Sequence, residues 1–328
     1  MSNIFGQNIK VSIFGESHSC AIGATIDGLK PGFKIDFEKL NALMASRRPS
    51  KEISSTKRLE PDSTEVICGI VDNVTTGAPL TVIILNADIN SGDYEKNIVR
   101  ASHSDFVAHK KYNGFNDYRG GGYFSGRLTA PLTFVGGIAL QILESHGITI
   151  SAEICDIGLS NDLNLELEKA HQNNSSVGAT IKCKVTGVDK YIGNPFFNSL
   201  ESEISRMMFS VPAVKGIEFG DGFAFAKSYG DEVLDEYFYD ENGDVKTKTN
   251  HNGGIVGGIA NLMPIEFKVV IKPTASIFKE QNSINLATKE NVKYMIKGRH
   301  DSCIAIRAVP VIKAATALVI LDNYLNFR

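Results

Sequence analysis

β-Branched residues are concentrated in six short stretches of this chain, and several of these stretches also alternate hydrophobic and polar positions. This composition is typical of β-strands, and the alternation favours antiparallel pairing with one face buried. The predicted strands span residues 9–14, 65–70, 80–85, 148–154, 179–185 and 265–271.

Three segments have helical patterns. Residues 36–48 begin at Asp36, which suits a helix N-cap, and place four apolar side chains on one face. Residues 131–147 begin with Pro131 and end at a glycine. Residues 310–325 are almost entirely apolar, which predicts a buried helix. Because strands and helices do not alternate regularly, the pattern predicts an α+β fold in which sheets cover the helices.

The domain organisation is predicted to be simple. We find no internal repeat and no linker, so residues 1–328 are expected to form one large domain. Residues 228–250 are the least hydrophobic part and predict a mobile excursion. Their "DENGD" sequence (240–244) has the acidic residues of a calcium loop, but its glycine is misplaced for an EF-hand, so we expect a solvated loop.

Composition and charge narrow the function classes. The net charge of −3 gives no overall attraction to nucleic acid or to an anionic membrane, so any anion must be bound locally. The N-terminus lacks a signal pattern, and we expect no apolar run to approach the roughly 20 residues of a membrane helix, so we expect a cytoplasmic protein. The five cysteines form no Cys-x-x-Cys pair, so we expect small buried hydrophobes and no metal site.

Residues 100–127 combine cations with three consecutive glycines, Gly120 to Gly122. A solvated loop could carry the charges, but three glycines suit close approach of the main chain to a ligand, so we expect an anion site. His103 lies two residues before Asp105, which could orient its ring for proton transfer. A polar turn is the alternative.

A second cluster, "FGESHS" (14–19), follows a predicted strand. It partly matches the nucleophile elbow of serine hydrolases, but the residues after it do not favour a helix, so Ser17 is a weak candidate nucleophile. His18 is either a structural residue or an acid–base group. Arg47 and Arg48 end a predicted helix, where they could bind an anion or only complement the helix dipole.

Two further clusters lie near the C-terminus. The glycine pairs within residues 251–258 lack the context of a dinucleotide fingerprint, so no Rossmann domain is predicted. Residues 272–276, "KPTAS", could offer a cation and hydroxyls to a phosphate. Arg299, His300 and Asp301 stand together before the last predicted helix, which is more charge than a helix cap requires.

In order and spacing, these clusters resemble the chorismate synthase family over nearly the whole chain. The resemblance implies one α+β domain with helices sandwiched between antiparallel β-sheets, assembled as a homotetramer. The motifs that carry it are "FGESHS", "RRP", "EPD", "VTTGAPL", "NAD", "HSDF", "KYNGFNDYRGGG", "AVKGIEFGDGF", "GGIVGGI", "KPTAS" and "GRHDSCIAIRAVPV".

The resemblance also implies the chemistry. Members convert 5-enolpyruvylshikimate-3-phosphate to chorismate and phosphate by a 1,4-elimination that requires reduced FMN. It gives catalytic roles to His18, His103 and Asp301. Arginine matches the substrate's carboxylates and phosphate. The substrate-binding candidates are Arg47, Arg48, Arg100, Arg127 and Arg299. The candidates for FMN are Ser125, Ala213, Gly257, Lys272, Pro273, Thr274, Ala275, Ser276 and Arg299.

Some positions depart from the family pattern. Tyr123 and Phe124 replace polar flavin contacts, although stacking on the flavin could compensate, so both join the FMN candidates. Pro212 stands where an asparagine is expected. Ser19, Ala101 and Ile53 also differ from the family's usual glycine, proline and arginine.

These departures leave an alternative open, in which the chain is a catalytically weakened or inactive member that acts as a binding or assembly subunit. Retention of His18, His103 and Asp301 argues against it. The sequence leaves open whether NADPH or an external flavin reductase supplies the reduced flavin.

Overall fold

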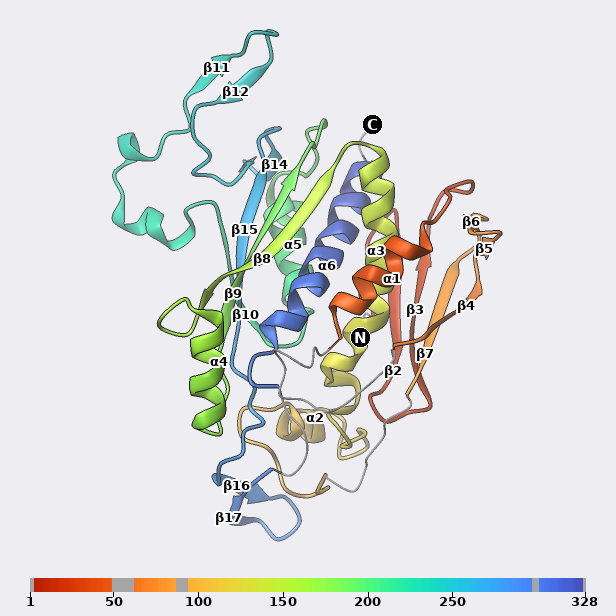
Figure 1. Ribbon diagram of the computed structural model, residues 1–328, viewed down its shortest axis with the longest axis vertical. Helices are drawn as coiled ribbons and strands as arrows, with labels where there is room; N and C mark the ends of the chain where they lie inside the picture. Colours follow the sequence, from red (N-terminus) through yellow and green to blue (C-terminus); the bar gives the residue numbers. More distant parts are fainter. Residues whose placement is uncertain (1–2, 49–61, 87–93, 297–300, 327–328) are drawn as a thin grey trace.

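Two antiparallel β-sheets enclose a layer of helices (Figure 1). The computed structural model describes residues 3–48, 62–86, 94–296 and 301–326. The arrangement confirms the predicted α+β fold with helices between antiparallel sheets. The two sheets hold five and four strands, and the shorter pairings among the described residues are two-stranded.

The first sheet has the strand order β1-β2-β3-β7-β4. Alternate residues of β3 and β7, including Ile22, Val82 and Ile84, are fully buried because this face covers the helices. The strands predicted at 9–14, 65–70 and 80–85 all belong to this part of the chain. Their bounds are Ile4–Phe5 (β1), Lys10–Gly15 (β2), Ala21–Asp27 (β3), Thr64–Cys68 (β4) and Leu80–Leu85 (β7), with the short pair Ile70–Val71 (β5) and Val74–Thr75 (β6) beside them.

The second sheet has the order β10-β15-β9-β8. Ile181, Cys183 and Phe267 on its inner face are buried. Its outer face is charged, and Glu266 accepts ion pairs from Lys182 and Lys184. The strands are Thr149–Ile157 (β8), Ala179–Thr186 (β9), Val214–Phe219 (β10) and Ile265–Ile271 (β15), so three further strand predictions are confirmed.

The helix layer contains α1, α3, α5 and α6 (Figure 1). Their bounds are Phe37–Ser46 (α1), Thr129–Ser145 (α3), Leu200–Met208 (α5) and Ala305–Asn326 (α6). Asp36 caps α1 as predicted, with its side chain accepting a hydrogen bond from the Lys39 amide at 3.0 Å. The sequence analysis did not predict α5, nor the outer helices Asp105–Lys111 (α2) and Leu163–Gln172 (α4).

A buried carboxylate ties the two ends of the chain together. Asp322 in α6 is 3% exposed and accepts hydrogen bonds from the backbone amides of Gln7, Asn8 and Ile9. Three amide donors satisfy a carboxylate that would otherwise be costly to bury. The contact holds the segment before β2 against the last helix.

The expectation that no apolar run approaches the length of a membrane helix was wrong for one helix. Residues 126–145, which include α3, are long and apolar enough to cross a membrane. However, 83% of their most apolar stretch is buried inside the protein, as in the core helix of a globular fold. The buried position is explained by packing against α1, α6 and both sheets.

Residues 228–250 contain a short 3-10 helix, Gly230–Glu232, and a β-hairpin that projects from the second sheet (Figure 1). Its strands are Tyr237–Tyr239 (β11) and Val245–Thr247 (β12). The Asp240 side chain accepts hydrogen bonds from the amides of Asn242 and Asp244, so this sequence closes a turn. The mobility of the segment stays a prediction.

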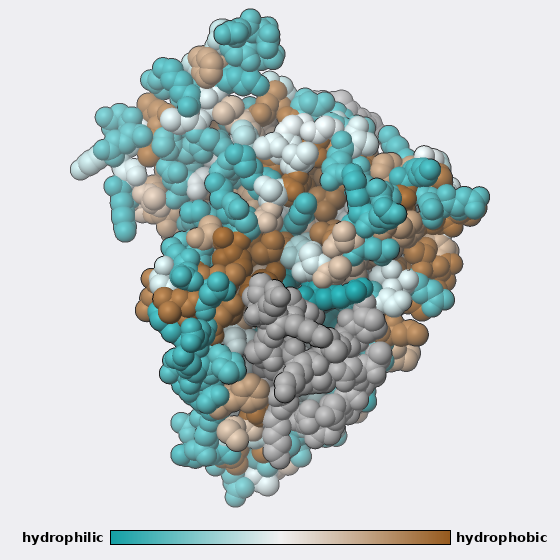
Figure 2. Space-filling view, in the orientation of Figure 1, coloured by the Kyte–Doolittle hydropathy of each residue, from teal (hydrophilic) through white to brown (hydrophobic). Residues whose placement is uncertain are grey.

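The cysteines are not all buried as the sequence predicts. Cys20 and Cys68 are exposed, so the prediction that the cysteines are buried was wrong for these two and right for Cys183 and Cys303. Hydrophobic patches lie among hydrophilic side chains on the face in Figure 2. Four phenylalanines are more than 80% exposed: Phe115, Phe196, Phe197 and Phe223, at 91%, 85%, 94% and 81%.

Candidate active site

The consecutive glycines bring the main chain against two histidine rings. Gly120 and Gly121 have φ angles of +61° and +102°, which other residues rarely adopt. A Cβ on Gly120 would lie 2.5 Å from the His18 ring, and one on Gly121 would lie 3.3 Å from the His103 ring. Residues 120–121 therefore place His18, after β2, and His103, before α2, on one site.

His103 is oriented by a carboxylate. Its Nδ1 lies 2.6 Å from Asp105 Oδ1. Because an ionised carboxylate only accepts hydrogen bonds, Nδ1 carries the proton and Nε2 is the other reactive nitrogen. The same carboxylate accepts from Arg100 through Nε and Nη2, both at 2.7 Å. Burial alone would raise the pKa of Asp105, but hydrogen bonds from Arg100 and His103 lower it below its usual range.

His18 is enclosed. It is 5% exposed, and its ring meets the Tyr94 ring edge-on, with centroids 5.3 Å apart. The neighbouring Ser17 is fully buried and donates its hydroxyl to the Arg119 carbonyl at 3.2 Å. A strand, β3, follows this loop where an elbow requires a helix. Both observations weigh against Ser17 as a nucleophile.

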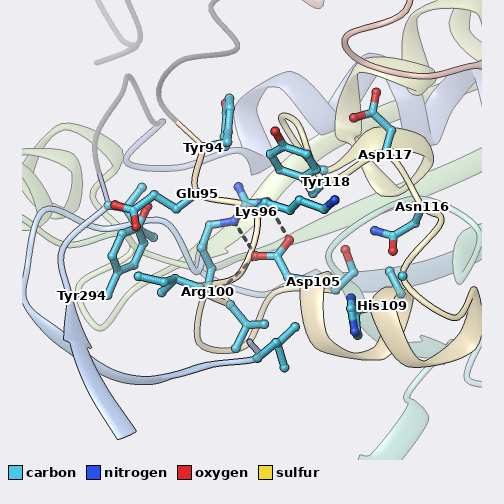
Figure 3. Close-up of a pocket in the computed structure, with 18 residues that line it drawn as sticks. Tyr94, Glu95, Lys96, Arg100, Asp105, His109, Asn116, Asp117, Tyr118 and Tyr294 are labelled. Carbon is cyan, nitrogen blue, oxygen red and sulfur yellow. Dashed lines mark hydrogen bonds and ion pairs between the residues drawn. The ribbon is translucent and has the colours of Figure 1, made fainter. Parts of the chain in front are cut away.

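A pocket open to solvent adjoins Gly121 and α2 (Figure 3). Its wall carries charges of both signs, including Lys96, Arg100 and Asp117. Asp117 accepts two 2.8 Å hydrogen bonds from Arg119. The wall also contains Tyr94, Glu95, Asp105, His109, Asn116, Tyr118 and Tyr294.

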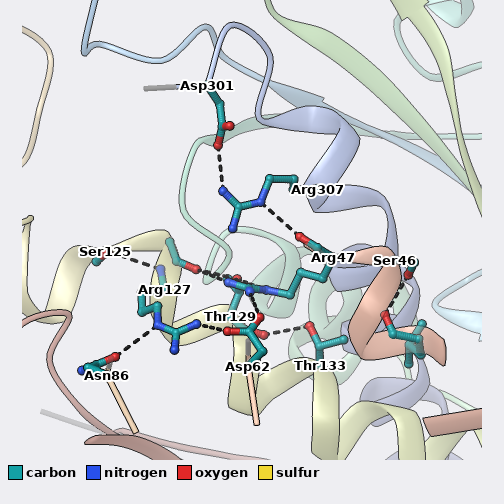
Figure 4. A network of polar contacts seen from close by, with 12 residues as sticks. Ser46, Arg47, Asp62, Asn86, Ser125, Arg127, Thr129, Thr133, Asp301 and Arg307 are labelled. Carbon is teal, nitrogen blue, oxygen red and sulfur yellow. Dashed lines mark hydrogen bonds and ion pairs between the residues drawn. The ribbon is translucent and has the colours of Figure 1, made fainter. Parts of the chain in front are cut away.

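Two of the predicted substrate arginines share one buried carboxylate (Figure 4). Arg47 donates to Asp62 at 2.8 Å, and Arg127 donates to its other oxygen. Arg47 also donates to the Thr129 hydroxyl, and Arg127 to the Asn86 side chain at 3.1 Å. Arg47 is the C-cap of α1, but its side chain points into this cluster, so it does more than complement the helix dipole.

The pKa shifts follow from burial and pairing. Burial lowers the pKa of Arg47 to about 10, while Asp62 opposes this by favouring the charged form. For Asp62, burial alone would raise the pKa, but Arg47 and Arg127 lower it below its usual value. The arginines therefore keep the carboxylate ionised inside the protein.

Asp301 connects with this cluster through a further arginine. Arg307 donates to Asp301 Oδ2 at 2.8 Å and to the Arg47 carbonyl oxygen at 3.1 Å (Figure 4). Counting only the residues that the structure describes, three guanidinium groups and two carboxylates meet here, with a net charge of +1. Arg48 is exposed next to Arg47. Arg299, His300 and Ile53 lie outside the described residues.

Several positions expected to contact FMN are joined to these groups. The Lys272 amide donates to the Ala213 carbonyl at 2.9 Å, and its amine donates to the Ser102 carbonyl at 2.8 Å. The Thr274 hydroxyl donates to the Asp301 carbonyl at 3.0 Å. These bonds place residues 272–276, which include Pro273, Ala275 and Ser276, beside the loop of His103.

Tyr123 and Phe124, the two aromatic residues expected to contact the flavin, directly follow the three glycines in the chain. Tyr123 and Phe124 are 36% and 37% exposed. The Tyr123 hydroxyl donates to the Ile13 carbonyl at 3.2 Å, and Phe124 meets Tyr112 edge-on. Ser125 accepts a hydrogen bond from the Arg127 amide.

Gly257 is not brought to these residues within one chain. It lies in the turn between Ile255–Val256 (β13) and Ile259–Ala260 (β14). This hairpin packs near the first residue of β15, whereas Lys272 follows the last. The seven residues of β15 separate the two ends by about 20 Å.

The sequence analysis did not name Arg307, Asn86 or Thr129 as site residues, and it used Asp62 only as part of the "EPD" motif. Asp62 could have been predicted as a site residue, because the "EPD" motif is one of those that carry the family resemblance. Arg307 gave no comparable signal, because its contact with Arg47 joins residues 260 positions apart. Among the described residues, no three His, Cys, Asp or Glu side chains form a group that could hold a metal ion.

The fold places two histidines on one glycine turn, one of them oriented by a carboxylate, in a site that also contains buried arginines. Such a site belongs to a class of enzyme suited to an anionic substrate and acid–base chemistry. The sequence matches the chorismate synthase family profile over residues 9–325. The chain therefore belongs to the chorismate synthase family, whose members are lyases of the shikimate pathway to aromatic amino acids.

Individual relatives agree with this assignment. A chorismate synthase of Chitinophaga pinensis is 43% identical over 98% of this chain and 96% of its own length. One from Thermococcus gammatolerans is 37% identical over 98% of this chain and 97% of its own. A crystal structure of chorismate synthase has the same fold, with a TM-score of 0.74 and 21% identity, over 98% of this chain and 92% of that one.

Proposed function

We propose that this chain converts 5-enolpyruvylshikimate-3-phosphate to chorismate and phosphate at the site of His18, His103 and Asp301, with reduced FMN. The observation that carries the proposal is the packing of both histidine rings onto Gly120 and Gly121. This contact gathers two proton-transfer groups from separate loops, within a chain whose relatives are chorismate synthases.

The positive charge would bind the substrate. Among the described residues, Arg47 and Arg127 exceed their shared carboxylate, Asp62, by one charge, which favours the substrate's anionic groups, while the charge of Arg307 is balanced by Asp301. Because Arg47 and Arg127 are nearly buried, they would act mainly through their charge. Arg48, which is exposed, would bind the substrate's anionic groups together with Arg100 and Arg299.

The proton transfers would be divided among three side chains. His18 would donate a proton to the leaving phosphate, and Asp301 would take part in proton removal at the other end of the elimination. His103, oriented by Asp105, would hold its Nε2 toward the flavin. Reduced FMN, when bound, supplies transient electron donation.

The residues present fit FMN. Lys272 offers an amine, Ser125, Thr274 and Ser276 offer hydroxyls, and Tyr123 and Phe124 offer half-exposed rings that could stack on a flat ring system. Ala213 has a φ of +74°, a conformation unusual for a residue with a side chain and frequent at ligand sites. These groups suit an anionic phosphate and a planar ring.

We also propose that a second copy of the chain completes the flavin site in a homotetramer. Gly257 and Lys272 lie near opposite ends of β15, which are about 20 Å apart, so Gly257 would line the same flavin from another subunit. The highly exposed phenylalanines support burial of this surface in an assembly.

Anaerobic incubation with the substrate tests the function. With dithionite-reduced FMN, we expect chorismate and phosphate in equal amounts. A parallel reaction with oxidised FMN and NADPH tests whether the protein reduces its own flavin, and product only after adding a flavin reductase would indicate an external partner. Flavin and substrate binding without any chorismate would support the inactive binding subunit and contradict the proposal.

A further inference from the structure

Arg307 links two parts of the site that come from distant segments of the chain. It is the third residue of α6, and its guanidinium makes contacts on two sides. Nη1 donates to Asp301 Oδ2 at 2.8 Å, and Nε donates to the Arg47 carbonyl at 3.1 Å. The pair with Asp301 is largely shielded, since the side chains are 30% and 10% exposed.

The second contact uses a carbonyl that the helix leaves available. Arg47 caps α1, and the last carbonyls of a helix lack partners within it. Arg307 satisfies this one from outside. A planar guanidinium can hold two acceptors in fixed directions, which a lysine amine does less well. The geometry therefore requires an arginine rather than a positive charge alone.

Two contacts among the described residues hold Asp301 in place. The Thr274 hydroxyl donates to its main-chain carbonyl at 3.0 Å, and Arg307 holds its carboxylate. The first bond ties the residue to the segment 272–276, and the second ties it to the end of α1. The main chain and the carboxylate are thus positioned by different segments of the fold.

We propose that Arg307 is a positioning residue that holds the Asp301 carboxylate in its reactive orientation, using the end of α1 as the anchor. The inference rests on the proposed function, because it assigns Arg307 a part in the same elimination. Arg307 acts through Asp301 and does not need to touch the substrate. Loss of such an orienting contact slows the chemical step more than it weakens binding.

The test compares Arg307→Gln, Asp301→Asn and the double variant with the wild-type protein. We expect Arg307→Gln to lower kcat by about a hundredfold, the scale of a misplaced reacting group, with KM and the Kd of FMN within about threefold. In the Asp301→Asn background, Arg307→Gln should have almost no further effect. Arg206→Gln is the matched control, because this arginine lies on α5 over the Phe5 ring.

Two measurements separate positioning from a structural role. Thermal unfolding of the flavin-free Arg307→Gln protein should remain cooperative, with a Tm close to that of Arg206→Gln. In Arg307→Ala, added guanidinium should raise kcat several-fold, with no such effect on Arg206→Ala. Independent effects of the Asp301 and Arg307 substitutions, or a loss confined to KM, would overturn the inference. If the wild-type protein itself makes no chorismate, the proposed function fails instead.

Discussion

Asp62 is the residue on which the buried cation cluster depends. It is 4% exposed and is the shared ion-pair partner of Arg47 and Arg127. Without its charge, two guanidinium groups would remain buried with less compensation. The cost of breaking a buried pair usually exceeds its net contribution to stability, because the remaining charge stays desolvated.

We therefore predict that Asp62→Asn lowers the free energy of unfolding by about 3–5 kcal/mol. Urea unfolding followed by circular dichroism measures this. Glu236→Gln is the control, since Glu236 and its partner Lys248 are both 60% exposed and solvent screens such a pair, so its loss should change stability little. Equal effects of the two substitutions would contradict the importance of the buried cluster.

The lowered pKa of Asp105 predicts a dependence of stability on pH. A carboxyl whose pKa is lower in the folded protein stabilises it above the unfolded pKa of about 3.9. This stabilisation is lost as pH falls from there through the folded pKa. Unfolding free energies between pH 7 and pH 3 should therefore fall less steeply at the acid end for Asp105→Asn than for wild type. If the unfolding free energies of wild type and Asp105→Asn depended on pH in the same way, the contacts with Arg100 and His103 would not lower the pKa of Asp105.

At the scale of elements, α3 and α6 approach closely because α3 contains Gly136. A Cβ on Gly136 would lie 2.4 Å from the Ala314 carbonyl oxygen in α6, closer than atoms can pack. The two helices form the centre of the layer between the sheets (Figure 1). Their separation therefore sets how the sheets are spaced.

We predict that Gly136→Ala destabilises the protein by about 1–3 kcal/mol, the usual cost of overpacking. The direction of the change in unfolding free energy is informative, because a glycine-to-alanine change inside an exposed helix would stabilise the protein by up to about 1 kcal/mol. Gly230→Ala serves as the control, since nothing lies within 4 Å of its Cβ position. A stabilised Gly136→Ala protein in chemical denaturation would show that the helices can move apart freely.

The elements found from the sequence are those with a strong local pattern. The sequence was sufficient to predict β7 and β9 from their alternating pattern and α6 from its apolar composition, because the burial of these elements follows from hydrophobicity alone. Helix α5 was missed although Ser199 caps it and Leu200 and Ile204 are buried. Helix α2 is seven residues long, too short for a periodic signal.

The candidate site was predicted as a set of clusters but not as an arrangement. Motifs near His18, His103 and Asp301 were visible in the sequence. Their relative positions depend on contacts between distant residues, such as Gly120 against His18 and Lys272 against Ser102. No local pattern encodes such contacts.

At the scale of the whole molecule, Gly257 tests whether two copies share one flavin site. It has a φ of +62°, and apart from its chain neighbours no described residue has an atom within 4 Å of a Cβ built there. Alanine should therefore cost only the backbone strain, about 1–2 kcal/mol. A larger effect on flavin binding would therefore support a contact of Gly257 with the flavin.

We predict that Gly257→Ala raises the Kd of FMN at least fivefold while the subunit stays folded. Flavin titration with light scattering measures both binding and assembly. Gly243→Ala is a matched control, because Gly243 also has a positive φ of +84° and open space around its Cβ, at the tip of the β11–β12 hairpin. If both variants bind FMN like wild type, Gly257 does not line the flavin site.

The central claim is that this chain catalyses the elimination with Asp301 in the chemical step. Single-turnover formation of chorismate tests it, using rapid anaerobic mixing of enzyme, saturating reduced FMN and 5-enolpyruvylshikimate-3-phosphate. The account predicts that wild type forms chorismate, and that Asp301→Asn binds both ligands within about threefold yet reacts about a hundredfold more slowly, the usual scale for a proton-transfer group. Asp301→Asn turnover at the wild-type rate, or no chorismate from wild type, would contradict the account.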